Sequence, residues 1–374
     1  WATVPAAEGD MAPEPSHGQH AAPPGLPPSL RLVFWETTAR CNLQCVHCRR
    51  MDEGGDASGD LTGGEARQMI ADLAAHWPGL ILVFSGGEPL MRDDTLDLAR
   101  EARGRGLAAA LATNGTLVTP ALAARIAEAG FRRVSVSLDG AAAATHDAIR
   151  GQAGSFDAAL RGLRLVRDAA VPVQINMSIT RRNAAELEPM FRLAEAERVA
   201  ALHIFIVVPV GCGMSLGPED RLSPDEYERL LREFYRRSGA SPLEAKATCA
   251  PQYARLVRQV QATDGAAAPG DQRRPSPGGG CLAGTGVCFV GHGGEVFPCG
   301  YLPVSCGNVR EAPLSHLWAT SDVFVRLRDR GQLGGKCGCC EFATVCGGCR
   351  ARAFAATGDW MAEEPDCLYR PQRR

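Results

Sequence analysis

The sequence predicts an α/β fold, in which a partial (β/α)6 barrel of the TIM type is followed by a C-terminal cysteine-rich extension. Between about residues 31 and 208, short apolar runs alternate with amphipathic stretches, a pattern typical of a parallel sheet with right-handed crossovers. Six such units suggest a partial barrel rather than a full one. Residues 281–374 hold ten of the 15 cysteines and too little apolar surface for an independent core, so metal sites are expected to stabilise them.

The strands and helices of the barrel are predicted from the spacing of apolar residues. The expected strands are short apolar runs, and the expected helices carry apolar residues every three or four positions between Gly, Pro, Asp, Thr or Asn boundaries. The strands are Leu32–Glu36, Leu80–Phe84, Ala108–Ala112, Arg133–Leu138, Val173–Ile179 and Leu202–Val207. The helices are expected near residues 64–75, 93–105, 120–129, 156–169 and 184–198, with two more at 223–237 and 251–261.

The chain is expected to divide into four parts. Residues 1–29 are rich in Ala, Pro and Gly, contain no Lys or Arg, and are interpreted as a disordered tail. A signal peptide needs a cationic start and an apolar stretch, and residues 1–29 have neither. A cytoplasmic location is therefore expected. The barrel follows at 30–210, a helical connection with a low-complexity linker at 211–280, and the cysteine-rich part at 281–374.

Composition and charge exclude several classes of protein. The 374 residues are 45% hydrophobic and carry a formal net charge of −2, so neither wholesale disorder nor strong attraction to nucleic acid is expected. No apolar run approaches the ~20 residues of a membrane helix. In a reducing cytoplasm, 15 cysteines favour metal binding over disulfides.

The sharpest motif is Cys41-x3-Cys45-x2-Cys48, directly after the first strand. Three thiolates on one short loop can bind three irons of a [4Fe–4S] cube and leave the fourth iron open to a small molecule. An open metal position is typical of a reactive site. The alternative is a zinc knuckle in which His47 supplies the fourth ligand.

This spacing resembles the signature of the radical S-adenosylmethionine (SAM) enzymes. The resemblance implies that Cys41, Cys45 and Cys48 hold a catalytic [4Fe–4S] cluster whose open iron chelates the amine and carboxylate of SAM. Reduction of such a cluster cleaves SAM to methionine and a 5′-deoxyadenosyl radical. The cluster itself must first be reduced, which implies an external low-potential donor such as a ferredoxin or a flavodoxin.

The ends of the following strands carry further matches to this family. Ser85–Pro89 resembles the GGEP motif, whose glycines allow close backbone approach and whose glutamate would accept from the SAM ammonium. An ordinary turn is the alternative for the glycines and for Asn114, and a surface salt bridge is the alternative for Arg150. The residues that the resemblance assigns to SAM are Gly86, Gly87, Glu88, Asn114 (adenosine pocket), Ser137 and Asp139 (ribose or carboxylate), and Arg150 (carboxylate).

The C-terminal cysteines resemble the SPASM extension of radical SAM enzymes, which binds two auxiliary [4Fe–4S] clusters. Carried over, the first cluster has the ligands Cys281, Cys288, Cys299 and Cys349, and the second has Cys337, Cys340, Cys346 and Cys367. The alternative is a pair of zinc sites, which cannot carry an electron. The cysteines without an assigned role are Cys212, Cys249, Cys306 and Cys339, which are expected to be small buried side chains.

Three stretches, residues 32–41, 295–303 and 346–367, are similar to the heme b synthases of the siroheme-dependent pathway. This resemblance implies oxidative decarboxylation of two propionates of iron-coproporphyrin III. The radical would take a hydrogen from the carbon next to the macrocycle, and loss of carbon dioxide gives a vinyl group only if one electron also leaves. An auxiliary cluster is the expected acceptor.

Cations are expected around a substrate with four propionates, because guanidinium groups bind carboxylates bidentately. The candidates beside the motifs are Arg31, Arg40, Arg49, Arg50, Arg350 and Arg352. His47, His203 and His292 are candidate axial ligands of the substrate iron, although a core or surface role is expected more often for a histidine.

Three other functions stay open at this point. A related tetrapyrrole enzyme would act on didecarboxysiroheme. A peptide-maturing SPASM enzyme would bind a leader peptide, usually through an extra N-terminal domain, for which residues 1–30 are too short. A ferredoxin-like electron carrier would need neither the barrel nor an open iron.

Overall fold

The computed structural model describes residues 30–49, 57–263 and 279–372. The expected N-terminal tail, most of the expected linker at 263–280 and the candidate Arg50 lie outside these described residues.

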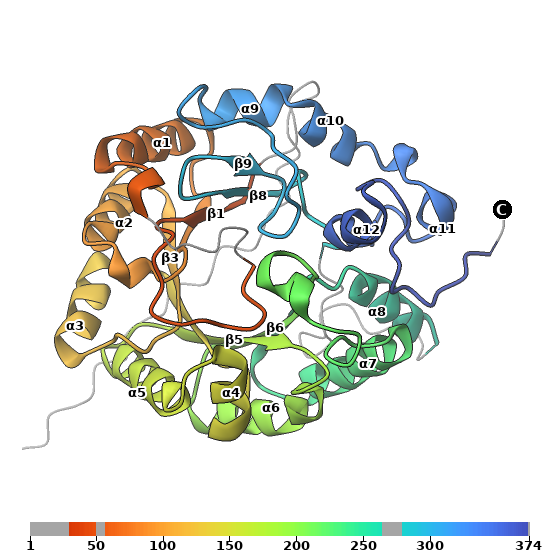
Figure 1. Ribbon diagram of the computed structural model, residues 1–374, viewed down its shortest axis with the longest axis horizontal. Coiled ribbons are helices and arrows are strands. Elements are labelled where there is room, and N and C mark those ends of the chain that lie inside the picture. Colours follow the sequence, from red (N-terminus) through yellow and green to blue (C-terminus); the bar gives the residue numbers. More distant parts are fainter. Residues whose placement is uncertain (1–29, 50–56, 264–278, 373–374) are drawn as a thin grey trace, which may run out of the picture.

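Within the described residues, nine strands form one open sheet in the order β7-β6-β5-β4-β3-β2-β1-β8-β9 (Figure 1). Neighbouring strands run parallel throughout, except for the antiparallel pair β8 and β9. The strands are β1 Leu32–Glu36, β2 Ile81–Ser85, β3 Ala108–Thr113, β4 Arg133–Ser137, β5 Val173–Ile179, β6 Ala201–Ile206, β7 Glu244–Thr248, β8 Val287–Val290 and β9 Val296–Phe297.

Helices surround the sheet: α1 to α8 follow its outer side, and α9 to α12 complete the ring (Figure 1). No described helix is long and apolar enough to cross a membrane. The helices are α1 Gly63–His76, α2 Thr95–Gly104, α3 Pro120–Ala129, α4 Ala143–Arg150, α5 Ser155–Asp168, α6 Leu187–Ala196, α7 Pro224–Ala240, α8 Gln252–Thr263, α9 Leu314–Thr320, α10 Asp322–Arg328, α11 Gly335–Gly338 and α12 Arg350–Thr357.

Local sequence explains where the helices begin and which face they bury. In α1, Thr62 and Glu65 form a capping box, and Met69, Ile70 and Leu73 lie on the buried face at helical spacing. Such a cap contributes about 1 kcal/mol. Ser223 and Glu226 form the same box at the start of α7, so these two starts are dictated by short sequence patterns.

The predicted fold class is confirmed, since all six predicted strands are present with ends shifted by no more than one residue. Between residues 30 and 263, one strand and one α-helix were not predicted. Strand β7 was missed because it is a short edge strand with exposed Glu244 and Lys246. Helix α4 was missed because its buried face carries His146 and Arg150 in place of apolar side chains.

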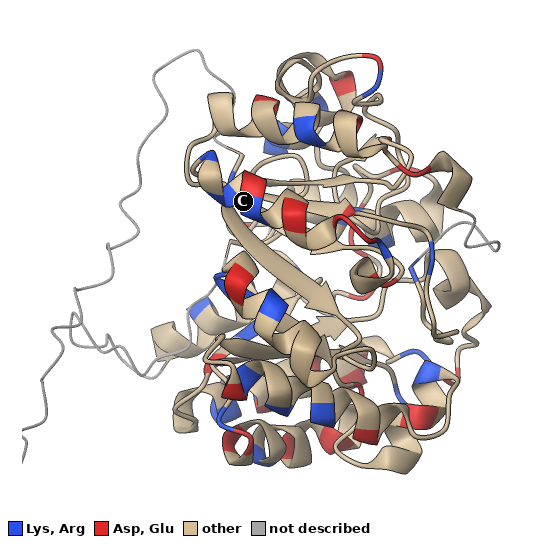
Figure 2. Cartoon of the chain, turned by 90° about the vertical axis from the view of Figure 1, so that its left-hand side faces the viewer, with Lys and Arg blue, Asp and Glu red and all other residues tan. Residues whose placement is uncertain are grey.

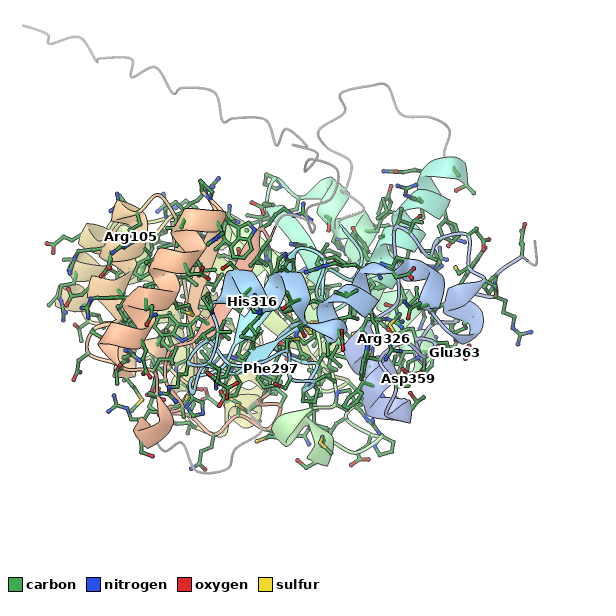
Figure 3. All side chains as sticks on the ribbon, turned by 90° about the horizontal axis from the view of Figure 1, so that it is seen from above. Arg105, Phe297, His316, Arg326, Asp359 and Glu363 are labelled. Carbon is green, nitrogen blue, oxygen red and sulfur yellow. The ribbon has the colours of Figure 1, made fainter. Side chains whose placement is uncertain are left out.

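The C-terminal part joins the barrel through β8, which extends the parallel sheet beside β1. It also contributes to a second apolar cluster, separate from the main core, which includes Val208, Leu302, Leu333 and Met361. From above, Figure 3 shows the molecule running from Arg105 at one end, past His316 of α9, to Glu363 at the other. On the face shown in Figure 2, basic and acidic residues are interspersed along the outer helices.

Candidate functional site

Cys41, Cys45 and Cys48 lie together on the loop that follows β1, at the carboxyl end of the parallel strands. This is the end at which barrels of this architecture bind their substrates. The three cysteines form no disulfide and are partly exposed. The loop is turned by the Cys48 N–H, which donates to the Cys45 carbonyl at 3.2 Å, and the Leu43 N–H donates to Cys41 Sγ at 3.5 Å.

The donor set of this loop fits an open cube better than a zinc knuckle. The imidazole of His47 faces Asp139, with 3.3 Å between Nε2 and Oδ2, and burial lowers the pKa of His47. Among the described residues, no three His, Cys, Asp or Glu side chains gather as one metal ion requires. A [4Fe–4S] cube binds each thiolate to a different iron, so its ligands need not converge on one point.

The glycines of the GGEP turn pack against the backbone that leads into the cysteine loop. The Gly87 N–H donates to the Thr38 carbonyl at 2.9 Å, and the Glu88 N–H donates to the Arg40 carbonyl at 2.7 Å. A Cβ on Gly87 would lie 2.2 Å from the Arg40 carbonyl oxygen, and one on Gly86 would lie 3.0 Å from that of Thr38. The close backbone approach that these glycines permit is therefore to the loop of the three cysteines.

Glu88 is fully buried and joins the ends of β2 and β3. Its carboxylate accepts from Thr113 Oγ1 at 2.7 Å, the Asn114 N–H at 2.8 Å and the Leu90 N–H at 3.1 Å. Burial raises its pKa, while these donors oppose the rise. Contact between Glu88 and a SAM ammonium stays a prediction.

Asn114 also contacts the cysteine loop. Its Nδ2 donates to Asn42 Oδ1 at 2.8 Å, and Asn42 Nδ2 donates to Thr116 Oγ1 at 2.8 Å. Asn42 was not predicted, because a single amide between Cys41 and Cys45 carries no signal of its own. This pair of amides fixes the first half of the loop to the end of β3.

A buried ion pair lies under the second half of the loop. Asp139 Oδ2 is 2.7 Å from Arg150 Nη2, and the two side chains are 0% and 9% exposed. Arg150 Nη1 also donates to Cys45 Sγ at 3.6 Å. Although burial alone would raise it, Arg150 and His47 hold the pKa of Asp139 below its ordinary value. Arg150 is thus bound inside the protein rather than in a surface salt bridge.

Helix α4 brings Arg150 to this place through its last turn. The Ile149 carbonyl accepts from the Val46 N–H at 3.0 Å, and Gly151, at φ +70°, approaches the Gln44 carbonyl. A Cβ on Gly151 would lie 2.5 Å from that carbonyl oxygen. Ser137 ends β4 opposite Asn176 of β5, and its role toward SAM stays a prediction.

The structure brings Cys337, Cys340, Cys346 and Cys367 to one cavity near α11 and the C-terminal segment. These are the four residues expected to hold the second auxiliary cluster. Burial raises the pKa of Cys346 to about 12. The fit is chemical as well as spatial, because four thiols around one cavity are the donor set of a closed cube.

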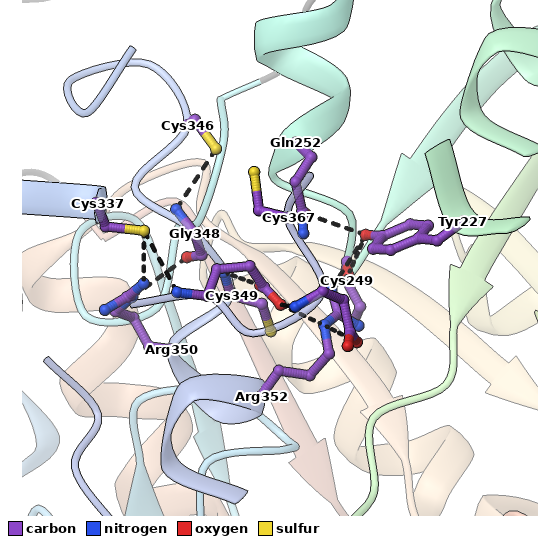
Figure 4. Close-up of polar contacts among 12 residues, drawn as sticks. Tyr227, Cys249, Gln252, Cys337, Cys346, Gly348, Cys349, Arg350, Arg352 and Cys367 are labelled. Carbon is purple, nitrogen blue, oxygen red and sulfur yellow. Dashed lines mark hydrogen bonds and ion pairs between the residues drawn. The ribbon is translucent and has the colours of Figure 1, made fainter. Parts of the chain in front are cut away.

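The other cysteine group contains a residue that sequence reasoning missed. Cys249, which follows β7, packs with Cys299 and Cys349 against the second apolar cluster. Burial raises the pKa of Cys249, and the nearby thiols of Cys349, Cys299 and Cys281 raise it further. Figure 4 shows Cys249 beside Cys349.

Cys288 lies elsewhere, in β8 opposite Val33 of β1, and both side chains are buried in the main core. Its neighbour Phe289 faces the other side of the sheet, because side chains alternate along a strand. There Phe289 lies under Arg49, with 4.2 Å from Cζ to the ring centre. The residue near the Cys288 thiol is Cys306, so the structure separates Cys288 from Cys281, Cys299 and Cys349.

Two of the three remaining cysteines without an assigned role are exposed. Cys212 lies in the 3-10 turn Gly211–Ser215, and Cys339 turns toward the carbonyls of Gly335 and Lys336. Their expected burial is therefore wrong, whereas Cys306 is buried as expected.

Two of the candidate arginines are enclosed by protein groups. Arg350 donates to the carbonyls of Trp360 and Ala362 at 2.9 and 2.7 Å, and Arg352 donates to the Cys249 carbonyl at 2.5 Å. Both side chains are buried, so neither is available to an incoming carboxylate. Arg40 donates to the Met91 carbonyl at 2.6 Å.

Arg49 is placed differently, next to Cys48 and 3.5 Å from Glu36 Oε1. Tyr301 lies beside it: burial raises the pKa of Tyr301, and its neighbours include Cys249, Arg49, Cys299 and Cys48. Tyr301 is therefore near both Cys48 of the three-cysteine loop and Cys249 and Cys299 of the other group.

The three candidate axial histidines all have protein partners. His47 faces Asp139 as described, and His292 Nδ1 is 3.1 Å from Asp60 Oδ1. His203 Nδ1 is 2.9 Å from Gln174 Nε2. Each position is thus explained by contacts within the protein.

Comparison with protein families agrees with this geometry. Residues 35–194 match the radical SAM superfamily, and residues 281–341 match SPASM, an iron–sulfur cluster-binding domain. The AdoMet-dependent heme synthase of Methanosarcina barkeri is 46% identical, covering 92% of this chain and 98% of its own length. The AdoMet-dependent heme synthase of Nitratidesulfovibrio vulgaris is 41% identical, covering 96% and 97%. The pre-heme d1 synthase of Dinoroseobacter shibae is 35% identical, covering 93% and 89%.

Solved structures share the fold at lower identity. Streptococcus suis SuiB bound to precursor peptide SuiA has a TM-score of 0.73 at 13% identity, covering 92% of this chain and 77% of that one. Native anSMEcpe with bound AdoMet has a TM-score of 0.64 at 20% identity, covering 86% and 89%. Together with the curated relatives, these likenesses mean that the chain belongs to the radical SAM superfamily, in the family of the AdoMet-dependent heme synthases, and is an enzyme of the radical SAM type.

Proposed function

We propose that this chain is a heme b synthase that converts two propionates of iron-coproporphyrin III to vinyl groups by oxidative decarboxylation. Support comes from the relatives named AdoMet-dependent heme synthase, at 46% and 41% identity over nearly the whole of both chains. Relatives named pre-heme d1 synthase and Fe-coproporphyrin III synthase are 35% and 33% identical. This difference favours the heme synthase over an enzyme that acts on didecarboxysiroheme.

One structural observation carries the proposal. A group of three cysteines lies at the carboxyl end of the barrel strands, and two further groups of four cysteines lie beyond it, with Tyr301 near both the loop and the group of Cys249. With SAM and iron–sulfur clusters bound, the open cluster would supply a deoxyadenosyl radical for hydrogen abstraction. An auxiliary cluster would accept the electron that the substrate must lose when carbon dioxide departs. A simple electron carrier would need no open group.

The ligand sets belong to the proposal. We assign the catalytic cluster to Cys41, Cys45 and Cys48. One auxiliary cluster is assigned to Cys337, Cys340, Cys346 and Cys367, and the other to Cys249, Cys281, Cys299 and Cys349. Cys249 takes the place expected for Cys288 because it lies with the other three thiols, whereas Cys288 is buried in the main core.

The chain's own residues would orient the reacting groups. Arg150 and Asp139 fix the loop of the three cysteines. The glycines of the GGEP turn pack against the backbone that leads into this loop. Arg49 is the candidate for binding a substrate carboxylate, because its guanidinium lies beside the loop and its contacts are a 3.5 Å approach to Glu36 Oε1 and the ring of Phe289. An external low-potential donor and a cytoplasmic location complete the proposal.

The decisive experiment is anaerobic reconstitution of the protein, followed by incubation with SAM, a reductant and iron-coproporphyrin III. We expect a product with one vinyl group and then a product with two, identified by mass spectrometry. A parallel reaction with didecarboxysiroheme is the matched control and should leave that substrate unchanged. Active SAM cleavage with unaltered iron-coproporphyrin III would contradict the proposal and favour a peptide-maturing enzyme.

A further inference from the structure

A buried ion pair joins the two auxiliary cysteine groups. Arg352 Nε is 3.0 Å from Glu364 Oε1, and the side chains are only 3% and 0% exposed. Arg352 was one of six arginines considered for the substrate carboxylates, but its Nε and Nη2 donate to Glu364, Tyr227 and the Cys249 carbonyl inside the protein. Charges in such a water-poor region act strongly on any redox group nearby.

The pair contacts the group of Cys249 on one side. The Cys349 N–H donates to Glu364 Oε2 at 2.6 Å, and Arg352 Nη2 donates to the Cys249 carbonyl at 2.5 Å. The same guanidinium donates to Tyr227 Oη at 3.0 Å. Each member of the ion pair therefore hydrogen-bonds to the backbone of one cysteine of this group, and Figure 4 shows Arg352 beside Cys249.

The same pair contacts the group of Cys337 on the other side. The Glu364 N–H donates to Cys337 Sγ at 3.3 Å, and Glu364 lines the cavity of the four cysteines. Gly348, at φ +59°, lets the two groups approach, because a Cβ there would lie 2.9 Å from Glu364 Cβ and 3.1 Å from Cys337 Sγ. Glu364 thus touches one cysteine of each group directly.

Other charged groups act on only part of this arrangement. Arg350 Nη2 donates to Cys337 Sγ at 3.8 Å and has its other contacts with backbone carbonyls. Asp366 lies 3.6 Å from Arg352 Nε, and its N–H donates to Glu364 Oε1 at 3.3 Å. Within this network, Glu364 is the residue with a contact in each cysteine group: its carboxylate accepts from the Cys349 N–H, and its main-chain N–H donates to Cys337 Sγ at the cavity that Glu364 also lines.

We propose that Glu364 and Arg352 form one shared element that positions both auxiliary clusters and sets their reduction potentials together. The inference rests on the proposed function, because it requires a cluster in each cysteine group. Hydrogen bonds and nearby charges tune cluster potentials. Since the pair is neutral as a whole, removing either member leaves one buried charge that acts on both clusters.

The test is a redox titration of the reconstituted full-length protein, followed by electron paramagnetic resonance. Addition of SAM identifies the signal of the open cluster. Glu364→Gln leaves the Arg352 cation unbalanced, so the potentials of both auxiliary clusters should rise. Arg352→Gln leaves the carboxylate unbalanced, so both should fall, and the double variant should return both toward the wild-type values.

Two matched variants separate this role from a general effect of mutation. Arg350→Gln removes a side-chain hydrogen bond to Cys337 Sγ and none to the Cys249 group, so it should shift the potential of the Cys337 cluster more than that of the other cluster. Glu65→Gln breaks the remote exposed pair with Arg310 and should shift neither. If Glu364→Gln instead weakens cluster binding, loss of iron from both groups supports the shared positioning role, whereas loss from one group overturns it.

The outcome that overturns the inference is a Glu364→Gln protein with its full iron content and with one or both auxiliary potentials unmoved. Failure of the proposed function looks different. Wild-type protein with about eight irons in place of about twelve would contradict two auxiliary clusters, and the shared element with them. Full iron content without vinyl formation would contradict the proposed reaction only. The auxiliary-cluster potentials of the Glu364 and Arg352 variants would then still test the shared element.

Discussion

Asp139 and Arg150 form a buried ion pair directly beneath the loop of Cys41, Cys45 and Cys48, with 2.7 Å between Oδ2 and Nη2. Asp139 follows β4 and Arg150 ends α4, so the pair connects two elements of the barrel at the loop. The Ser178 N–H also donates to Asp139 Oδ1 at 2.7 Å. The position of the cysteine loop therefore depends on a buried ion pair between two barrel elements.

Asp139→Asn should destabilise the protein strongly, because it leaves the Arg150 guanidinium buried without its partner charge. Breaking a buried pair in this way costs about 3–5 kcal/mol. The free energy of unfolding, measured anaerobically with urea, tests this expectation. Asp168→Asn is the control, because Asp168 is 63% exposed in its pair with Arg167 and should lose less than about 1 kcal/mol. Equal losses in the two variants would contradict the role of the buried pair.

Gly87→Ala should disturb the entrance to the cysteine loop. Its Cβ would meet the Arg40 carbonyl oxygen at 2.2 Å and the Ala39 carbonyl oxygen at 2.8 Å, and backbone atoms cannot rotate away. We expect a loss of about 1–3 kcal/mol of unfolding free energy and lower iron retention. Gly104→Ala is the matched control in α2, where no atom lies within 4 Å of the new Cβ, and it should gain up to about 1 kcal/mol. A stable, iron-replete Gly87→Ala protein would show that the loop tolerates displacement.

His146 should make stability depend on pH below neutrality. Burial and Arg150 lower its pKa to about 4 from an ordinary value of 6.5, while Asp139 and Asp147 oppose this and His47 adds to it. The ring accepts from the Asp139 N–H through Nδ1 at 3.1 Å, which requires the neutral form. Between pH 6.5 and 4 the unfolded chain binds this proton and the folded chain does not, so stability falls as pH falls.

The expected loss from this one histidine between pH 7 and pH 5 is about 2 kcal/mol. His146→Asn keeps an acceptor for the Asp139 N–H but cannot titrate, so its unfolding free energy should lack this part of the pH dependence. Parallel urea titrations at the two pH values measure the difference between the proteins. The same slope in both would show that His146 is not the group responsible.

The sequence predicted those parts of the fold and site that depend on local patterns. Six strands follow from apolar runs, and the cavity of Cys337, Cys340, Cys346 and Cys367 gathers a set expected from resemblance to SPASM. Most of that set is closely spaced along the chain. The pairing of β8 with β1 was not predicted, because contacts between distant strands leave no periodic signal in either one.

The difference between the expected and the observed grouping of the cysteines has the same physical origin. Cys288 lies near Cys281 and Cys299 in sequence, but strand alternation turns its thiol into the main core. Cys249 lies far from them in sequence, and the unpredicted strand β7 carries it to their side. Sequence spacing predicted that cysteines gather in this part of the chain better than it predicted which individual cysteines meet.

Cys249→Ala and Cys288→Ala therefore form a matched pair of variants. Cys249→Ala should lose about four of about twelve irons per chain, because a ligand of one auxiliary cluster is removed. Cys288→Ala should keep its iron and lose only a little stability, since it deletes one sulfur in the core. Iron and sulfide analysis after anaerobic reconstitution distinguishes them. If Cys288→Ala lost iron and Cys249→Ala did not, the ligands would be Cys281, Cys288, Cys299 and Cys349, and the assignment of Cys249 would be wrong.

Arg49→Gln should weaken binding of the tetrapyrrole, because it removes the cation beside the cysteine loop while keeping a polar side chain of similar reach. A lost charge-assisted contact to a propionate predicts a rise in KM of about tenfold, equivalent to about 1.4 kcal/mol. SAM cleavage without substrate should stay unchanged, since Arg49 contacts Glu36 and Phe289 rather than the Asp139 pair.

Arg31→Gln is the control for this prediction. Arg31 precedes the first residue of β1, whereas the cysteine loop follows the last, so about 16 Å of strand separates them. Its substitution should leave KM for iron-coproporphyrin III unchanged. If Arg31→Gln raised KM and Arg49→Gln did not, the substrate carboxylates would lie at the amino end of the strands, and the proposed binding mode beside the cysteine loop would be wrong.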